Sequence, residues 1–384
     1  MTVTGLSFVF AFLAGLVLAL VRHPMYGLIT YVAVFYLHPP SRWWGEYLPD
    51  LRWSLAAAAV LIFATLRYKP LVERSWLSTT PAKLLIVFSV WLWIQSFWAM
   101  EQNKHFECAV MFTKYIVVFF VVHRLLDTPE KIRAFLLAHL FGCAYLGIIA
   151  LTTDTSGRLD GVGGPGIDDS NTLGMHIATG AVAGAVLMLL EKRVWLWGCA
   201  IAALLSANTL VMTGSRGAFL ALLCGGLVLV YLHPKAQRKK FWIYAVVAVL
   251  GFGAVASQEF WERMGTLKAV VDEEQELEGS AESRIAMAYA QLEMAKHYPF
   301  GNGHRGSEVL SAQYLDPRWL TKEGARSSHN TFLTLLVEQG IPGVIIFFCY
   351  VTWGFRSLRK LKRLLDTSET THLGMYGAAA AAGL

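Results

Sequence analysis

Long apolar runs, separated mostly by short polar connections, fill most of the chain. The runs occur at about 5–21, 25–37, 54–66, 81–99, 106–122, 132–151, 172–190, 194–212, 217–232, 241–256, 331–355 and 373–384. A helix of roughly 20 apolar residues crosses the hydrocarbon core of a bilayer. The pattern therefore predicts an all-α, polytopic integral membrane protein with about 11–12 transmembrane helices.

One long polar segment, residues 257–330, interrupts this pattern. Within it, Ser280 followed by an acid predicts a helix start, and apolar residues at helical spacing follow until the chain reaches Pro299. Arg284 falls in the first turn of this helix, where a cation opposes the helix dipole. We expect one large, partly helical loop, and hence three parts: a helix bundle at 1–256, a catalytic loop at 257–330 and C-terminal membrane helices at 331–384.

The end of the loop predicts a second helix that is broken. Ser328 is a candidate N-cap, Gly340 a candidate helix end, and Pro342 a candidate start for the next helix. A broken helix at membrane depth is tolerated where protein or a watery cavity surrounds it. We therefore expect His329 at a helix N-terminus beside such a cavity.

The Lys/Arg content of the connections alternates and predicts their orientation. Basic connections at 67–83, 123–133, 191–193, 233–240 and 356–363 are expected on the cytoplasmic side. The connections at 38–53, 100–105, 152–171, 213–216 and 257–330 are then expected on the outer side. This places the large loop on the outer side of the membrane.

Composition agrees with a membrane location. The chain has 384 residues, 55% hydrophobic and 16% charged, against about 25% charged in soluble domains. The net charge of +6 suits acidic membrane lipids or a phosphate-bearing substrate. No basic stripe with interleaved aromatic residues indicates a nucleic-acid partner. The first apolar run lacks a basic segment before it and is expected to be a membrane helix, not a cleaved signal.

Metal and cofactor chemistry receives no support from the sequence. The five cysteines all sit inside apolar runs and are expected to be small buried hydrophobes: Cys108, Cys143, Cys199, Cys224 and Cys349. No Cys-x-x-Cys motif or Cys/His cluster suggests a metal. We expect no metal and no cofactor.

Arginines in the outer connections are the candidate ligands for phosphate, because guanidinium keeps its charge and donates in a fixed fork. They are Arg158, Arg216, Arg284 and Arg305. Arg216 sits in a four-residue connection and is favoured as functional. Arg305, like Arg318, is also interpreted as a solvated loop charge, and Arg284 has both interpretations open.

Histidine is the candidate general base, since a neutral imidazole is available near pH 7. His329 is the first choice, with a capping or packing role as the alternative. Asn330, which follows it, and His304 are also candidate substrate contacts. His304 is the weaker candidate because it lies in the glycine turn 301–306. The glycine-rich connection 152–171 adds Asp169 and Asn171 as candidate substrate contacts, since glycine lets backbone approach a ligand.

The chain resembles the O-antigen ligase and O-antigen polymerase superfamily of bacterial envelope proteins. The resemblance is carried by Thr213-Gly214-Ser215-Arg216-Gly217-Ala218, by Glu282-Ser283-Arg284 through Pro299-Phe300-Gly301-Asn302-Gly303, and by Ser328-His329-Asn330 through Glu338-Gln339-Gly340. Gly157-Arg158 and Asp169-Ser170-Asn171 look like the glycine-rich loop that precedes these motifs. The N-terminal half looks like the ligase branch associated with exosortase systems.

The resemblance implies a membrane-embedded glycosyltransferase-like fold that works without a metal. The donor would be a glycan on undecaprenyl diphosphate, and the acceptor a sugar hydroxyl of the lipid A-core oligosaccharide. The arginines would hold the diphosphate, and His329 would serve the acceptor in a single inverting displacement. A polymerase or a protein O-oligosaccharyltransferase with the same donor is the second expectation. A transporter for lipid-linked glycan is the third, although no paired halves with broken helices are evident.

Overall fold

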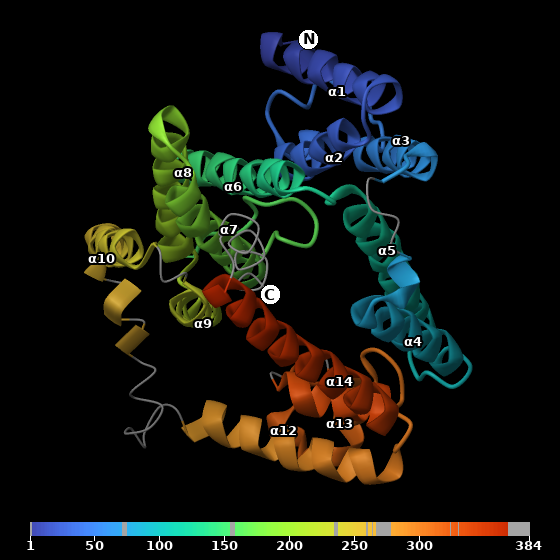
Figure 1. Cartoon of the computed structure of the whole chain (residues 1–384). Coiled ribbons are helices and arrows are strands. Elements are labelled where there is room, and N and C mark those ends of the chain that lie inside the picture. The colour runs from blue at the N-terminus through green and yellow to red at the C-terminus, as the bar shows by residue number, and fades with distance from the viewer. Residues whose placement is uncertain are drawn as a thin grey trace. The chain divides into compact units, whose positions relative to one another are not determined.

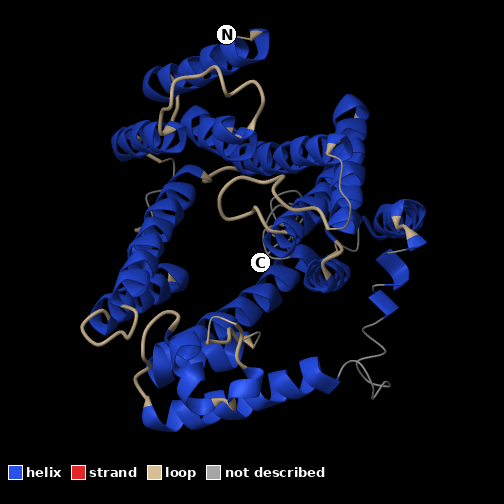
Figure 2. Ribbon diagram, turned by 180° about the vertical axis from the view of Figure 1, so that it is seen from behind, coloured by secondary structure: helices blue, strands red, loops and turns tan. Residues whose placement is uncertain are grey.

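The computed structural model describes residues 2–70, 75–153, 158–233, 237–258, 260–262, 264–265, 278–322, 324–328 and 330–367. Within these residues the chain forms helices joined by loops, with no strand (Figure 2). Eleven of the twelve apolar runs fall there, and each forms a helix. The twelfth, 373–384, lies outside the described residues. The prediction of an all-α, polytopic membrane protein is confirmed.

Six of the described helices are long and apolar enough to cross a membrane. They are α1 (Val3–Val21), α5 (Gln102–Leu125), α6 (Pro129–Thr152), α7 (Ser170–Leu190), α8 (Arg193–Thr213) and α14 (Thr331–Thr367). Three shorter helices are also apolar: α3 (Trp53–Arg67), α4 (Thr80–Gln95) and α9 (Arg216–Leu232). The remaining α-helices are α2 (Met25–Leu37), α10 (Arg238–Val255), α12 (Glu278–His297) and α13 (Gly306–Tyr314), with single 3-10 turns at Pro39–Ser41, Trp76–Ser78 and Pro317–Trp319 (Figure 1).

The chain forms two compact units, each built from separate stretches of sequence. The first comprises Met1–Glu73, Arg124–Gly265 and Ser357–Leu384, and the second comprises Arg74–His123 and Thr266–Arg356. The second unit therefore joins the helical part of the large loop to α4, most of α5 and the first part of α14. The three-part division into bundle, loop and C-terminal helices stays a prediction.

In the first unit, α7 is the central helix. It packs on α6, α8 and α9, and 67% of its apolar window is buried. Glycines allow this close packing: a Cβ on Gly174 would lie 2.8 Å from the Ala218 Cβ, and one on Gly184 would lie 2.9 Å from the Ala203 Cβ. Small residues at contacts let membrane helices approach closely. The start of α7 is thereby held against the turn between α8 and α9.

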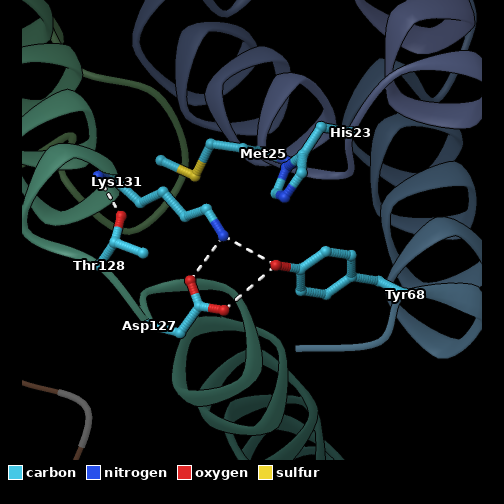
Figure 3. A network of polar contacts seen from close by, with 6 residues as sticks. All are labelled: His23, Met25, Tyr68, Asp127, Thr128 and Lys131. Carbon is cyan, nitrogen blue, oxygen red and sulfur yellow. Dashed lines mark hydrogen bonds and ion pairs between the residues drawn. The ribbon is translucent and has the colours of Figure 1, made fainter. Parts of the chain in front are cut away.

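A charged network joins the end of α3 to the start of α6 in the first unit, beside His23 and Met25 at the start of α2 (Figure 3). The Lys131 Nζ donates to the Asp127 Oδ1 at 2.5 Å and to the Tyr68 hydroxyl oxygen at 2.8 Å. The Tyr68 hydroxyl in turn donates to Asp127 Oδ2 at 3.1 Å. Met25 N–H donates to the His23 Nδ1 at 3.0 Å. Because Lys131 and Asp127 satisfy each other, we assign this end of α6 a structural role.

In the second unit, α12 begins at Glu278 and ends at His297, before Pro299 as expected. It starts two residues before Ser280, so Arg284 lies in the second turn and not in the first. The expected conflict between Arg284 and the helix dipole is therefore wrong, because that effect is confined to the first turn. Met287, Ala290 and Met294 of α12 pack with Leu310 of α13 and Val337 of α14.

The break in the last helix is confirmed at Gly340, whose backbone is non-helical with φ 68° and ψ −173°. At this break the glycine turn 301–306 packs across the backbone of α14. Asn302 N–H and Gly303 N–H donate to the carbonyl oxygens of Val337 and Glu338 at 3.2 and 3.0 Å, and Ile341 N–H donates to the Pro299 oxygen at 2.9 Å. Helix carbonyls freed by the kink thus find partners in the turn, as an interior of low polarity requires.

Side chains of α4 support the same crossing. The Gln95 amide donates to the carbonyl oxygens of Phe300 and Glu338 at 2.9 and 3.0 Å. The Trp91 indole N–H donates to the Gln339 oxygen at 2.9 Å. The crossing therefore ties the glycine turn, the kink and α4 into one packed element of the second unit.

Candidate functional site

The first polar cluster lies in the first unit, where loop 158–169 meets the turn between α8 and α9. The Arg158 Nη2 donates to the Asn171 Oδ1 at 2.7 Å, and the Arg158 Nε donates to the Thr213 carbonyl oxygen at 3.2 Å. The Ser215 hydroxyl donates to the same Asn171 oxygen at 3.0 Å. Three segments distant in sequence therefore meet at Asn171, which the sequence had marked as a candidate contact.

Helix caps fix this cluster. Gly214 ends α8 in the left-handed region with φ 56°, a conformation that glycine adopts without strain. Ser215 then caps α9 by accepting from the Ala218 N–H. Arg216 is the first residue of α9 and is half-buried. The positive end of the helix dipole therefore lies beside Arg216, and both the dipole and the arginine charge would attract a bound anion.

Asp169 is the N-cap of α7, not a free carboxylate. It accepts from the backbone N–H groups of Asn171 and Thr172 at 2.9 and 3.1 Å, and from the Thr172 hydroxyl. The hydrogen bond from the Thr172 hydroxyl, with those backbone donors, lowers the pKa of Asp169 below its ordinary value. This role explains an acid next to Asn171 by local structure. Its contact with substrate stays a prediction.

The second polar cluster surrounds a cavity of about 450 Å³ in the second unit. Its polar lining comes from Arg284, Arg326, Ser327, Ser328 and Asn330, and its apolar lining from Met287 and Phe332, with Thr331 beside them. Arg284 is exposed, and none of the described residues forms a hydrogen bond with its guanidinium. His329 lies between two lining residues but is outside the described residues.

Asn330 is the N-cap of α14, since its Oδ1 accepts from the N–H groups of Phe332 and Leu333 at 3.1 and 3.2 Å. The expected cap, Ser328, instead accepts from Asn330 N–H at 3.1 Å. The prediction of Ser328 as the cap is therefore wrong by two residues. Both side chains shape the chain on either side of His329.

Gln291 organises the inner wall of this cluster and was not singled out from the sequence. Its side chain is fully buried. Its amide nitrogen donates to Ser307 Oγ at 2.9 Å and to Thr334 Oγ1 at 3.2 Å, and its oxygen accepts from the Ser328 hydroxyl at 2.9 Å. Gln291 thereby holds the segment before α14 against α12 and α13. A polar residue among the apolar positions of α12 was the available signal.

Arg326 was also missed. Its Nη1 donates to the Trp319 carbonyl oxygen at 2.7 Å and its Nη2 donates to the Ser283 hydroxyl oxygen at 2.6 Å. Its backbone N–H donates to the Ser311 Oγ at 2.7 Å. Arg326 therefore stabilises the wall of the cavity through hydrogen bonds, whereas Arg284 is an exposed residue of the cavity lining.

His304 and Arg305 are not among the residues that line the cavity. His304 N–H donates to the buried His105 Nδ1 at 2.9 Å, and the His304 Nδ1 lies 3.5 Å from the Glu338 Oε2. Arg305 donates twice to Glu308, at 2.8 and 3.0 Å. These bonds lower the pKa of the Glu308 carboxyl. Arg305 thus makes a local ion pair, and a role in substrate binding for either residue stays a prediction.

The four candidate arginines are divided between the units, with Arg158 and Arg216 in the first and Arg284 and Arg305 in the second. Their convergence on one phosphate stays a prediction.

The cysteines correct two expectations. Cys224 and Cys349 are exposed on their helices, whereas Cys143 and Cys199 are buried. Cys143 further lies beside His139 and His176, with ligand atoms of all three within 4.8 Å of one another. The sequence showed no Cys/His cluster because these residues lie on two different helices.

The fold and these clusters define a multi-pass helical membrane protein with arginines and hydrogen-bonding groups gathered at helix starts. The family model of O-antigen ligase, Wzy_C, matches residues 201–348, a segment that includes Arg216, Arg284 and His329. The exopolysaccharide production protein ExoQ of Rhizobium meliloti (strain 1021) is 24% identical over 317 residues, which cover 77% of this chain and 69% of that protein. No solved structure matches.

These comparisons confirm the resemblance to the O-antigen ligase and polymerase superfamily. They support a membrane enzyme of ligase or polymerase type that acts on polysaccharide, and members of the family act on lipid-linked glycans.

Proposed function

We propose that the protein transfers a glycan from undecaprenyl diphosphate to a sugar hydroxyl of the lipid A-core oligosaccharide, on the periplasmic side of a bacterial inner membrane. The observation that carries this proposal is the cavity at the start of α14, which the exposed Arg284 lines together with Ser328 and Asn330, the sequence neighbours of His329. The family match over residues 201–348 includes this whole cavity.

The reaction breaks the bond between the anomeric carbon and the diphosphate oxygen while the acceptor hydroxyl attacks from the other face. Negative charge grows on the leaving diphosphate. Fixed positive donors placed at such a developing charge lower the barrier. Arg284 in the cavity wall supplies one, and a second such role for Arg216 remains the prediction from the sequence. Because guanidinium stays charged and forks onto phosphate oxygens, arginine replaces the divalent cation that many transferases need.

His329 takes the proton of the acceptor hydroxyl as the new glycosidic bond forms. A neutral imidazole is required for this, and the positive end of a helix dipole favours the neutral form. The position of His329 just before α14 supports the assignment. A single displacement of this kind inverts the configuration at the anomeric carbon.

A polymerase is the second candidate, and the relative named for exopolysaccharide production supports it. In that reaction the acceptor hydroxyl belongs to another lipid-linked glycan, while donor and leaving group are the same. The two candidates therefore differ in the acceptor alone.

The test is transfer by the purified full chain in detergent, with a labelled glycan on undecaprenyl diphosphate as donor. Lipid A-core, a second lipid-linked glycan and a serine-containing peptide are supplied separately as acceptors. We expect product with lipid A-core and release of undecaprenyl diphosphate in equal amount. Product with the lipid-linked glycan alone would establish the polymerase. No transfer to any of the three would refute the proposal.

The role of His329 is tested in the same assay. We expect His329→Ala to abolish transfer while the protein inserts and unfolds thermally as the wild type does. His297→Ala is the matched control, since His297 is exposed at the end of α12 and does not line the cavity. Transfer by His329→Ala at a rate near that of the wild type would remove His329 from the mechanism.

A further inference from the structure

Four polar side chains from three helices meet in the interior of the first unit. Tyr36 comes from α2, His139 and Cys143 from α6, and His176 from α7. The Tyr36 hydroxyl oxygen lies 2.5 Å from the His139 Nδ1, 2.7 Å from the His176 Nε2 and 3.5 Å from the Cys143 Sγ. Tyr36 is 3% exposed and Cys143 is fully buried. Polar groups inside a membrane protein are costly and by default have a function.

The sequence and packing are shaped around this cluster. His139 and Cys143 are four residues apart on α6 and so share one face, the spacing by which paired ligands on a helix hold a metal. Two helical glycines make room for the other members. A Cβ on Gly142 would lie 2.1 Å from the Tyr36 ring, and a Cβ on Gly180 would lie 2.5 Å from the Cys143 Sγ.

The hydrogen bonds assign the protons of the cluster. Thr179 Oγ1 donates to the His176 carbonyl oxygen at 2.7 Å, so it must accept from the His139 Nε2 at 2.8 Å. His139 Nδ1 therefore carries a lone pair, which accepts the Tyr36 hydroxyl proton. That leaves the His176 Nε2–H to donate to the Tyr36 oxygen. The ligand atoms of His139, His176 and Cys143 all surround this oxygen.

We propose that these four side chains bind a zinc ion. The ligands are His139 Nδ1, His176 Nε2, the Cys143 thiolate and the Tyr36 phenolate. Imidazole and thiolate suit Zn²⁺, which takes four ligands at about 2.0–2.3 Å. The nitrogen and sulfur atoms already lie within 4.8 Å of one another, so side-chain rotation brings them to that distance. The Thr179 hydroxyl holds the His139 ring from behind, as partners of metal-bound imidazoles do.

Charge balance supports four ligands. Binding releases one proton from Cys143 and one from Tyr36 to solvent, and the His176 ring proton moves from Nε2 to Nδ1. Two positive charges on zinc then meet two negative ligands. The resulting site is neutral overall, which a low-dielectric interior favours over an isolated charge. The ion would join α2, α6 and α7, and its side chains are separate from those proposed to act on the glycan.

The test uses the full chain purified in detergent without a polyhistidine tag and freed of metal with a chelator. We expect one Zn²⁺ per chain in titrations against a chromophoric chelator, with two protons released per ion. Co²⁺ in place of zinc should give the sulfur-to-metal absorption band of a thiolate ligand. Zinc should also raise the thermal unfolding temperature.

Variants separate this site from adventitious binding. Cys143→Ser should weaken zinc binding at least 100-fold and remove the Co²⁺–thiolate band, whereas Tyr36→Phe should release one proton instead of two. Cys199→Ser is the matched control, a buried cysteine on α8, and should bind as the wild type does. Absence of zinc binding by wild type at micromolar concentration, equal binding by Cys143→Ser, or preference for Cu⁺ over Zn²⁺ would each overturn the proposal.

Discussion

Replacing Arg284 with alanine should remove transfer but leave the fold intact. Arg284 is exposed in the cavity wall, and its guanidinium makes no hydrogen bond to any described residue. The substitution therefore costs folding little, within about 0.5 kcal/mol as for other surface positions. If Arg284 holds the leaving diphosphate, loss of one such donor costs about 3–4 kcal/mol in the transition state, or roughly 10²–10³ in rate.

Arg326 provides the contrast within the same cavity. Its guanidinium donates to the Trp319 oxygen and to the Ser283 hydroxyl. A hydrogen bond from a charged group contributes about 1.5–3 kcal/mol. Loss of both, offset by partial exposure, should lower the free energy of unfolding by about 2–4 kcal/mol. Arg326→Ala should therefore unfold at a lower temperature, which Arg284→Ala should not.

The assay measures initial transfer rate and thermal unfolding at matched amounts of protein. Arg284→Lys is included because lysine keeps the charge but loses the fork, and it should also fall well below wild type. Arg305→Ala, which loses the ion pair with Glu308, should transfer at nearly the wild-type rate. If Arg284→Ala and Arg284→Lys both keep full activity, the phosphate role of Arg284 is refuted.

Three further predictions concern cations, the kink and a helix cap. Transfer should not depend on added Mg²⁺ or Mn²⁺, and a strict requirement for either would contradict the arginine mechanism. Gly340→Ala should lower the free energy of unfolding by about 2–3 kcal/mol. The backbone φ of 68° at this position disfavours alanine, and a Cβ would lie 2.4 Å from the Phe300 carbonyl carbon. Unchanged thermal unfolding of the variant would refute this expectation. Folding lowers the pKa of Asp169, so its ionised carboxylate stabilises the fold above the unfolded pKa of about 3.9. This stabilisation should disappear as the pH falls through the folded pKa, and it should be absent in Asp169→Ala. Unfolding measured as a function of pH tests both expectations.

Much of the fold could be predicted from the sequence because helix length and apolarity are local properties. The break at Gly340 was also readable, since glycine and proline two residues apart stop and restart a helix. The N-cap was misplaced because Ser328 and Asn330 are both good caps two residues apart. Which of them reaches the free N–H groups depends on how Gln291 holds Ser328, and no local rule contains that contact.

The candidate site residues could be predicted where one short stretch of sequence contains them, but not where stretches far apart in the sequence meet. The meeting of Arg158, Asn171 and Ser215 depends on the close approach of α7 to the α8–α9 turn, which is a packing property. The cluster of Tyr36 with His139 and His176 spans over a hundred positions of sequence. Only the His139 and Cys143 spacing on α6 was visible beforehand, and a single pair does not specify a site.

The crossing of the glycine turn with the kink limits how this protein can be divided into fragments. A polypeptide of residues 257–330 ends before α14 begins and contains neither the carbonyls of Val337 and Glu338 nor the Gln95 side chain of α4. Its turn N–H groups would then face water or remain unpaired. We expect such a polypeptide not to hold the cavity by itself, so inhibitors or antibodies aimed at this cavity should be selected against the complete membrane protein.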